Sequence, residues 1–498
     1  MEVTSLEFLV FVLAAVALYY LMPDTRKPYM LIALSFLFIA SYDLRGILFL
    51  LGTALLIWYS GRKLKALDTS SREPAAVKTE KRRILMLTLV LVIGILAVLK
   101  YLGPMALGLV NPGGAGRLFV PIGLSYFTLQ AVSYVMDVYW KRIPSEQHYS
   151  RVLLFLCYFP QILQGPISRY RELSYELYEK PHGFQWHNVK YGVQRMLWGY
   201  FKVLVVANKL HHWVNNAFYG AEEAYGWVAL WGLIAAGFEL YANFSGGIDI
   251  ILGISRCLGI ELAENFRQPF FSRSLGEFWR RWHITLGSWM KDYVFFPLSL
   301  SRPFSRLKKS LKKRLDRKMA NRIPIALADI AVFLLVGIWH GLGSNYALWG
   351  LYNGLILAFS EVMAARYLKA KQALSIRDDS RLWTAFCILR TFVIITIGWA
   401  TDCTDTAMGS FRIVGNLIRF AEANPEIMHT TFFGFLTGAA GVAVMLGVDL
   451  LHEMGHSLRD WLNKRNFLVQ AIFWILVIQI IAMLGRDASV GGLMYAGF

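Results

Sequence analysis

Charged residues and cysteines are both scarce in this chain. Only 17% of its 498 residues are charged, against about 25% in a soluble globular protein, whereas 56% are hydrophobic. This composition excludes a soluble enzyme, a secreted disulfide scaffold and a disordered chain. The four cysteines form no C-x-x-C or other metal-ligand spacing, so we expect them to pack as small apolar side chains.

Acidic residues and the common catalytic motifs are also few or missing. Lys and Arg outnumber Asp and Glu by 51 to 33, which gives a net charge of +18. Because basic residues set the orientation of membrane proteins, this excess does not point to nucleic acid, and we expect no such partner. The sequence has no Walker-type phosphate loop, no G-x-S-x-G elbow, no H-E-x-x-H and no Cys/His cluster. We therefore expect no metal site and no bound cofactor.

Long apolar blocks account for the hydrophobic excess and predict an all-α polytopic membrane protein with about 11–12 spans. A span needs about 20 mostly apolar residues. Twelve stretches are candidates, some of them short enough to be re-entrant or tilted: 6–22, 29–42, 46–60, 84–102, 120–140, 195–217, 226–246, 324–344, 348–365, 383–401, 431–451 and 468–485. We expect residues 1–498 to form one integral membrane domain with no separate soluble domain.

Basic residues gather in loops that we assign to the inner face of the membrane. Loop 61–83 carries eight, loop 302–322 ten and loop 366–382 five, whereas loop 103–119 carries one and loop 218–225 none. This alternation is consistent with twelve crossings and places both termini outside. The first apolar block lacks the basic flank and cleavage site of a signal peptide, so we expect it to stay as a helix.

Segment 152–194 does not fit a simple span. Pro160, Gly165 and Pro166 interrupt its apolar start, and proline removes a backbone donor from a helix. Irregular backbone at membrane depth must be buried in protein or line a cavity. Residues 159–166 are therefore expected to form a re-entrant element at the cytoplasmic side, with a surface loop between two interfacial helices as the alternative.

His340 is the most informative ionisable residue, since such a group inside a span is costly and histidine can stay neutral there. Counted from Pro324 at 1.5 Å per residue, it lies about 24 Å along a helix, within a hydrocarbon core of roughly 30 Å. Gly337 and Gly341 flank it and permit close approach of a backbone or a ligand. The alternative is a core histidine satisfied by one hydrogen bond.

His283 is the second informative histidine. It lies in residues 277–293, where aromatic and apolar side chains recur at helical spacing and predict one amphipathic helix near the cytoplasmic face. The stripe consists of Trp279, Trp282, Leu286, Trp289 and Tyr293. An interfacial anchor explains the tryptophans, but it does not explain a histidine beside them.

Five stretches in order resemble the membrane-bound O-acyltransferase family, and especially its bacterial branch with the alginate O-acetyltransferase membrane subunit. The D-alanyl transfer protein of teichoic acids is a close relative of that branch. The stretches are 121–127 (PIGLSYF), 159–161 (FPQ) with 165–167 (GPI), 243–249 (NFSGGID), 278–283 (FWRRWH), and 339–341 (WHG) with 348–352 (LWGLY). The resemblance covers most of the chain.

The resemblance implies a helical fold around a central cavity that is open towards both faces. It implies that His340 is the catalytic histidine and that His283 is a second functional histidine on the cytoplasmic side. Other side chains in or near these stretches are expected to bind the donor or acceptor: Trp279, Arg280, Arg281, Trp282, Asp292, Trp339, Asn353, Asn243, Ser245 and Gln161.

The sequence departs from the family pattern at four positions. Asn353 stands where a second histidine often follows the deep one, so that histidine is not required here. Ser344, Gly287 and Lys291 replace a tryptophan, a serine and an arginine that are common in the family. These three changes bear on substrate details rather than on the class of reaction.

The expected reaction is transfer of a short acyl group, such as acetyl, from a cytoplasmic thioester to an extracytoplasmic hydroxyl. The donor is acetyl-CoA or a phosphopantetheine thioester on an acyl carrier protein. The resemblance implies that the acceptor is a polysaccharide, reached directly or through a membrane-anchored SGNH-type partner with a nucleophilic serine. The protein would lie among the lipids of the bacterial inner membrane. The alternatives are D-alanyl transfer to teichoic acid and, in another class, a proton-coupled transporter.

In this reaction a neutral His340 takes the proton of the acceptor hydroxyl, and His283 orients the donor carbonyl or relays a proton. An apolar cavity would exclude the water that hydrolyses thioesters. Arg280, Arg281 and the basic loop 302–322 suit the phosphates of coenzyme A or an acidic carrier protein. For that loop, topology and attraction to anionic lipid are an equally good explanation.

Overall fold

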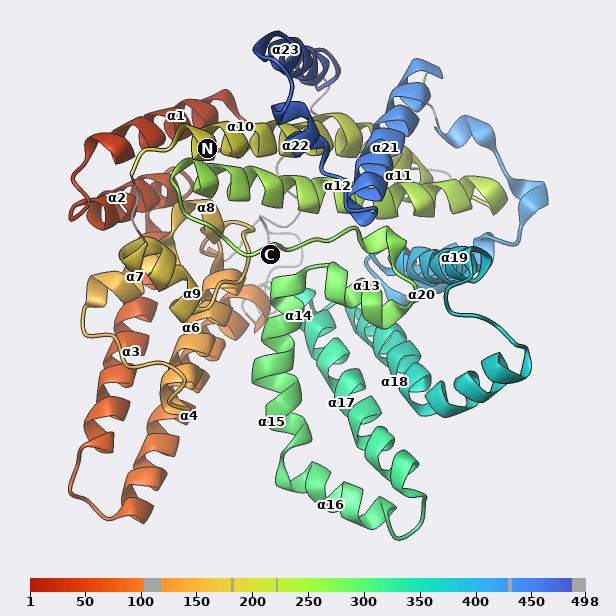
Figure 1. Ribbon diagram of the computed structural model, residues 1–498. Helices are drawn as coiled ribbons and strands as arrows, with labels where there is room; N and C mark the ends of the chain where they lie inside the picture. Colours follow the sequence, from red (N-terminus) through yellow and green to blue (C-terminus); the bar gives the residue numbers. More distant parts are fainter. Residues whose placement is uncertain (103–118, 181–182, 221–222, 429–431, 486–498) are drawn as a thin grey trace, which may run out of the picture. The chain divides into compact units, whose positions relative to one another are not determined.

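Helices make up most of the part of the chain that the computed structural model describes, which comprises residues 1–102, 119–180, 183–220, 223–428 and 432–485 (Figure 1). These residues contain no strand beyond one isolated bridge, which confirms the predicted all-α class. They group into two compact units that are each discontinuous along the sequence. Unit 1 contains residues 1–200 and 246–263, and unit 2 contains residues 201–245 and 264–485.

Unit 1 is built from the N-terminal helices. They are α1 (Leu6–Leu21), α2 (Lys27–Ala40), α3 (Arg45–Asp68), α4 (Pro74–Ala97), η1 (Val98–Leu102), α6 (Leu124–Tyr139), α7 (Tyr149–Cys157), α8 (Phe159–Ile162), α9 (Tyr170–Ser174), η2 (Tyr175–Glu179) and α10 (Trp186–Tyr200). Helix α6 is the centre of this unit, because fourteen of its sixteen residues are buried. It packs against α3 and α4, which are apolar and largely exposed on their other faces.

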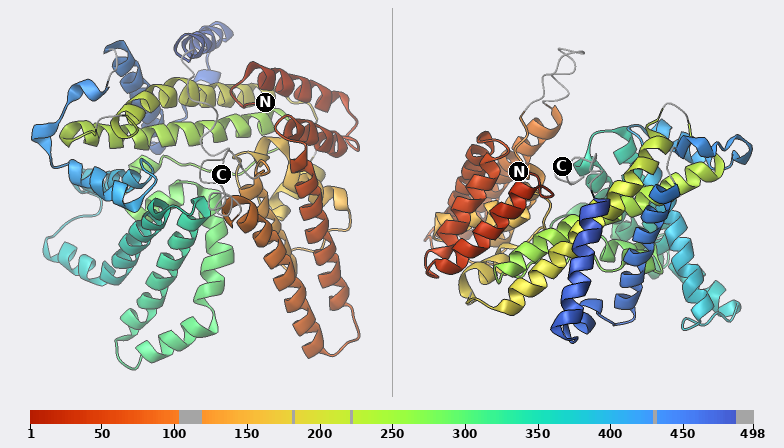
Figure 2. Two further views of the ribbon diagram at one scale, coloured as in Figure 1. Left: turned by 180° about the vertical axis from the view of Figure 1, so that it is seen from behind. Right: turned by 90° about the horizontal axis from the view of Figure 1, so that it is seen from above.

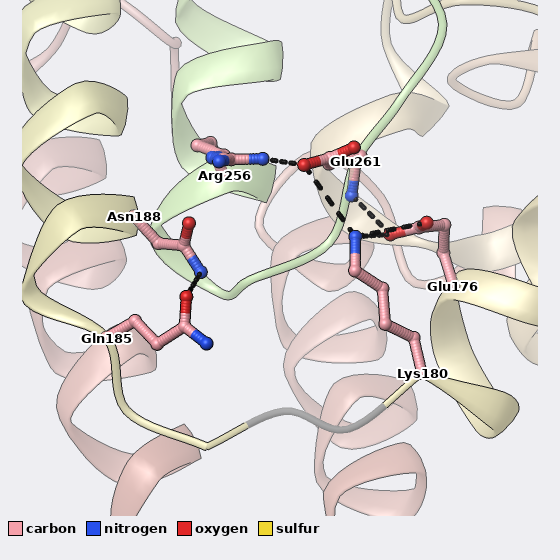
Figure 3. A network of polar contacts seen from close by, with 6 residues as sticks. All are labelled: Glu176, Lys180, Gln185, Asn188, Arg256 and Glu261. Carbon is pink, nitrogen blue, oxygen red and sulfur yellow. Dashed lines mark hydrogen bonds and ion pairs between the residues drawn. The ribbon is translucent and has the colours of Figure 1, made fainter.

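A polar network in unit 1 ties η2 to the chain that follows helix α12 (Figure 3). Lys180 pairs with Glu176 at 3.1 Å and with Glu261 at 3.7 Å, and Arg256 also pairs with Glu261. The backbone nitrogen of Glu261 donates to the Glu176 carboxylate at 2.7 Å. The ion pairs are partly exposed, so each contributes little energy, and together they fix the course of the chain after α12.

Unit 2 holds most of the remaining helices. They are η3 (Phe201–Ala207), α11 (Asn208–Phe218), η4 (Pro269–Phe271), α13 (Leu275–Arg281), α14 (Ile284–Met290), η5 (Lys291–Phe295), α15 (Phe296–Ser299), α16 (Arg302–Leu311), α17 (Arg317–His340), α18 (Ser344–Ala373), α19 (Arg381–Gly398), η6 (Trp399–Thr401), α20 (Ala407–Asn416), η7 (Phe420–Glu422), η8 (Pro425–Met428), α21 (Phe432–Glu453), α22 (Leu458–Asn463) and α23 (Phe467–Leu484). Helix α12 (Gly226–Cys257) contributes residues to both units.

Helices α17 and α18 form the most closely packed pair of unit 2 and run side by side (Figure 1; Figure 2). A three-residue connection joins them, so they are antiparallel neighbours. Glycines bring the two backbones together: a Cβ at Gly350 would lie 2.6 Å from the Phe333 carbonyl oxygen, and one at Gly354 would lie 2.9 Å from Ile330 Cα. Small residues at a helix interface allow this approach in membrane proteins.

The predicted spans fall on helices, and eight of the described helices are long and apolar enough to cross a membrane. This confirms a polytopic membrane protein. Predicted spans 6–22 and 29–42 match the shorter apolar helices α1 and α2, and 120–140 matches the buried α6. Span 195–217 is not one regular helix, since the π-helical η3 separates α10 from α11.

The predicted basic loops are largely helical. Helix α3 extends to Asp68 and α4 begins at Pro74, so most of 61–83 continues the two spans beyond their apolar parts. In the same way, 302–322 contains α16 and the start of α17, and α18 extends into 366–382. Lys, Arg and Glu are good helix formers, so the helices need not end where the apolar residues end. Most of loop 103–119 lies outside the described residues.

Segment 152–194 begins as the sequence predicted, with irregular backbone buried in protein. Residues 152–168 are buried without exception, through α7, α8 and the extended stretch after them. A surface loop, the alternative explanation, is therefore wrong for this stretch. The Phe159 backbone nitrogen donates to the Ser35 hydroxyl at 3.1 Å, and Gln161 accepts from Ser168 at 2.7 Å, so polar groups freed by the break find partners inside the protein.

Candidate active site

His283 lies at a break between two short helices, where the sequence predicted one continuous helix over 277–293. Helix α13 ends at Arg281 and α14 begins at Ile284. Between them, Trp282 pairs with Phe266 in an antiparallel bridge, and His283 adopts a left-handed backbone with φ of 46°. The prediction is wrong at this point because backbone pairing with a distant segment interrupts the helical hydrogen bonds.

The side chain of His283 is buried, with 4% of its surface exposed. Its ring packs edge-on against Phe244 of α12 at 4.8 Å between centroids, and its Nδ1 atom lies 3.2 Å from Oδ1 of Asn265. The Nε2 atom is buried and has no hydrogen-bond partner among the described residues. Burial, and secondly the charge of nearby His340, lower the pKa of His283 to about 3, so the resting ring is neutral.

His340 is the last residue of α17 and is half-buried among aromatic rings. The ring centroids of Trp339 and Trp349 lie 5.0 and 5.5 Å away, and the Tyr346 ring is stacked at 6.3 Å. Three of its neighbours therefore come from its own helix end and from α18. Both histidines belong to unit 2, and His340 is near enough for its charge to act on His283.

Trp279 and Asn353 connect α13 to α18 beside His340. The indole Nε1 of Trp279 donates to Oδ1 of Asn353 at 3.2 Å, and Asn353 donates through Nδ2 to the Trp349 carbonyl at 2.9 Å. The Trp279 ring also lies 5.3 Å from the Trp349 ring, which in turn contacts His340. We call the Trp279–Trp349 ring pair, together with the Trp339 ring that also contacts His340, the aromatic wall.

The tryptophans of the predicted stripe are packed within the protein rather than arranged as an interfacial anchor. Trp282 is 3% exposed and lies against Phe278 and Trp399, each at 5.4 Å. Trp289 is 5% exposed and packs on Tyr293 at 5.1 Å. Their aromatic surface therefore stabilises the broken helix from inside the unit.

The two adjacent arginines differ in their surroundings. Arg281 forms a two-pronged ion pair with Glu453 of α21, at 2.7 and 3.0 Å, and a further ion pair with Glu277 at 2.7 Å. Its guanidinium ties α13 to α21. Arg280 is exposed and belongs to none of the ion pairs found among the described residues.

The remaining predicted residues lie in several places. The Ser245 hydroxyl accepts from the buried Lys202 at 2.8 Å and donates to the Tyr241 carbonyl at 2.6 Å. Ser245 and Lys202 are therefore a buried polar pair beside Phe244 on α12. Asn243 on the same helix is fully buried, and Asp292 on η5 is partly exposed. Gln161 belongs to unit 1, whereas the other predicted site residues belong to unit 2.

Asn265 and Thr285 are site residues that the sequence did not single out. Both are buried beside His283, and Oδ1 of Asn265 accepts from the Thr285 backbone nitrogen at 3.0 Å. The unpaired N–H groups at the start of a helix need such an acceptor. If the sequence had shown that a second helix starts at residue 284, a nearby acceptor such as Asn265 would have been expected.

Comparison with known proteins identifies the family of this chain. The model of the membrane-bound O-acyltransferase family matches residues 124–397, which is more than half of the chain and includes both histidines. The chain belongs to this family. As a member, it is a multi-pass membrane enzyme that transfers acyl groups to hydroxyls.

This acyltransferase is similar to named enzymes of three kinds. A probable alginate O-acetylase of Pseudomonas syringae pv. tomato is 26% identical over 459 residues, which cover 90% of this chain and 80% of the relative. A peptidoglycan O-acetyltransferase of Helicobacter pylori is 29% identical over 267 residues, covering 49% and 47%. A teichoic acid D-alanyltransferase of Bacillus subtilis is 28% identical over 291 residues, covering 56% and 67%.

Proposed function

We propose that this acyltransferase moves an acetyl group from acetyl-CoA to a hydroxyl of an extracytoplasmic polysaccharide, or of a partner protein that acetylates it. The similarity to alginate O-acetylases extends over 90% of the chain, whereas that to a D-alanyltransferase covers 56%. A cytoplasmic donor and an external acceptor require a place in the bacterial inner membrane. The partner would be a membrane-anchored SGNH-type protein with a nucleophilic serine.

The observation that carries the proposal is the presence of two histidines in one unit, His340 against the aromatic wall and His283 buried and near enough for the charge of His340 to act on it. In the proposed reaction, the oxygen of the acceptor hydroxyl attacks the thioester carbonyl while a nitrogen of His340 takes the hydroxyl proton. The C–O bond forms, the C–S bond breaks, and the proton ends on the thiolate. The aromatic wall keeps bulk water from the thioester.

The donor would approach from the side that carries the basic residues. Exposed Arg280 and the basic helix α16 suit the phosphates of coenzyme A or an acidic carrier protein. Neutralising the basic residues of α16 should weaken use of the donor more at low salt than at high salt, since salt screens exposed charges. If donor use did not depend on salt, the basic residues of α16 would serve membrane orientation and contact with anionic lipid and not donor binding.

The test is transfer of labelled acetyl from acetyl-CoA by purified, folded protein, with His340→Ala compared against His456→Ala. His456 is exposed, so its loss serves as the control. His340→Ala should abolish transfer, and undiminished transfer in this variant would contradict the role of His340 as the base. A parallel reaction with a D-alanyl thioester on a carrier protein decides between the two acyl groups, because use of that donor alone would replace acetylation by D-alanylation.

A further inference from the structure

Asn265 makes the most specific polar contact to His283 in the described part of the chain. Its side chain is fully buried, and three polar atoms approach its Oδ1 atom. They are the backbone nitrogen of Thr285 at 3.0 Å, the hydroxyl of Thr285 at 2.9 Å and Nδ1 of His283 at 3.2 Å. One amide oxygen thus holds both the start of α14 and the imidazole ring.

The Thr285 backbone fixes the orientation of the Asn265 amide. A backbone N–H can only donate, so the side-chain atom that faces it must be the oxygen. The same oxygen faces Nδ1 of His283, and two acceptors at 3.2 Å would repel each other. Nδ1 therefore carries a hydrogen and donates it, and a neutral ring then has its lone pair on Nε2.

We propose that Asn265 is a positioning residue that fixes His283 as the Nδ1–H tautomer and so presents the Nε2 lone pair to the substrates. Nε2 is buried and has no hydrogen-bond partner among the described residues, so its lone pair is open to a substrate atom. The inference rests on the proposed acyl transfer and decides between the two roles of His283. A lone pair accepts a proton in a relay, but it cannot donate a hydrogen bond to the donor carbonyl.

The relay balances without any further reactant. The acceptor oxygen forms the new C–O bond as the C–S bond breaks, and the hydroxyl proton passes through imidazole nitrogen to the departing thiolate. His283 carries that proton at Nε2 only in passing, since its pKa is low, and Asn265 continues to accept from Nδ1–H while the ring is charged. The same hydrogen bond therefore serves the neutral and the protonated ring.

The groups around His283 keep the resting ring neutral. Helix α12 presents the Phe244 ring, and Asn265 and Thr285 present uncharged groups. Among the described titratable residues, His340 on α17 is the one whose charge acts on His283, and it opposes protonation. A neutral acceptor is therefore available across the physiological range of about pH 5–8.

The direct test is the protonation pattern of His283 in the full-length protein in lipid bilayers, read by nitrogen-15 NMR of labelled histidine. Its signals are identified by their loss in His283→Gln. We expect a protonated Nδ1 and a bare Nε2 over about pH 5–8. Asn265→Leu removes the acceptor and should admit the other tautomer, whereas Thr285→Val keeps the Thr285 N–H and should keep the pattern. A protonated Nε2 in the unmodified protein, or an unchanged pattern in Asn265→Leu, would overturn the proposal.

Kinetics give a second readout, and the pH profile is the part of it that a purely structural role would not move. Asn265→Leu should lower the rate of acyl transfer by about 10- to 100-fold, the range seen when the orienting partner of a metal-ligating histidine is removed. Asn265→Asp still accepts from Nδ1–H and should restore most of the rate. Its charge raises the pKa of His283, so transfer should now fall as the pH is lowered. A rate for Asn265→Asp with the same pH profile as the unmodified protein would contradict the proposal.

The two proposals fail in distinguishable ways. If the unmodified protein transfers no acyl group, the proposed function fails, and the NMR pattern still decides the tautomer. If Asn265→Leu does not fold, the spectrum of the unmodified protein and the behaviour of Asn265→Asp still decide the role of Asn265.

Discussion

Replacing Gly350 by alanine tests how closely α17 and α18 must pack for the site to form. The added Cβ would lie 2.6 Å from the Phe333 carbonyl oxygen and 2.8 Å from the Cα atom of Leu334. Both are backbone atoms and cannot rotate away. Since favourable contacts between heavy atoms lie at about 3.5–4.0 Å, the two helices would have to separate by roughly 1 Å.

Two effects of this separation can be estimated. Overpacking of this kind lowers the free energy of unfolding by about 1–3 kcal/mol. It also moves His340, on α17, relative to Trp349, on α18, whose ring centroid is 5.5 Å away. A misplacement of about 1 Å can lower a catalytic rate by about 10²-fold. We therefore expect Gly350→Ala to lose both stability and most of its acyl-transfer rate.

Gly447→Ala is the matched control for this experiment. Gly447 is exposed within α21, and a Cβ there meets nothing within 4 Å. Alanine should leave stability unchanged or raise it by about 0.5–1 kcal/mol, because glycine is a poor helix former. Thermal unfolding in one detergent reports stability, and release of the free thiol of coenzyme A with acceptor present reports transfer. Equal stability and rate for the two variants would refute the packing argument.

Three further predictions concern polar groups of unit 2. The pKa of His283 is lowered to about 3 in the folded protein, so between roughly pH 6.5 and pH 3 the unfolded chain binds a proton that the folded protein does not. The free energy of unfolding should therefore fall as the pH is lowered through this range. Unfolding of His283→Gln, measured against pH, should show a shallower decline. Arg281→Gln should lower the free energy of unfolding by about 1 kcal/mol, because it removes the ion pairs with Glu277 and Glu453. Arg280→Gln should instead raise the KM for the thioester and leave the Tm unchanged. A loss of stability in Arg280→Gln but not in Arg281→Gln would contradict the ion pairs described above. Trp279→Phe leaves the buried Oδ1 of Asn353 without its donor and should cost about 1–3 kcal/mol in thermal unfolding, while a neutral result would mean that another donor replaces the indole.

The positions of the spans could be predicted because run length and hydropathy are local properties of the sequence. Predicted spans 84–102 and 468–485 fall on α4 with η1 and on α23. Their ends could not be predicted from apolarity, since the helical hydrogen bonds continue through polar residues. Helix α3 therefore extends to Asp68, and α16 occupies a stretch that the charge pattern assigned to a loop.

The site was predictable in part for the same reason. His340 follows an apolar run directly, so its place on the helix α17 can be read locally, but α17 ends at His340 and not at residue 344 as the predicted span 324–344 implied. The break at His283 cannot, because its causes lie elsewhere in the chain: Asn265 is 18 positions away, and Glu453, which anchors Arg281, is 172 positions away. The helical period of residues 277–293 is real, but tertiary hydrogen bonds override it.

The left-handed backbone of His283 has a consequence for engineering this enzyme. Residues other than glycine adopt that conformation at a cost of about 1–2 kcal/mol, and glycine adopts it without strain. A redesign guided by stability alone would therefore favour glycine at this position and delete the imidazole. On the proposed role of His283, libraries screened only for heat tolerance should accumulate variants that transfer little acyl group, so residue 283 has to be held fixed or selected for activity.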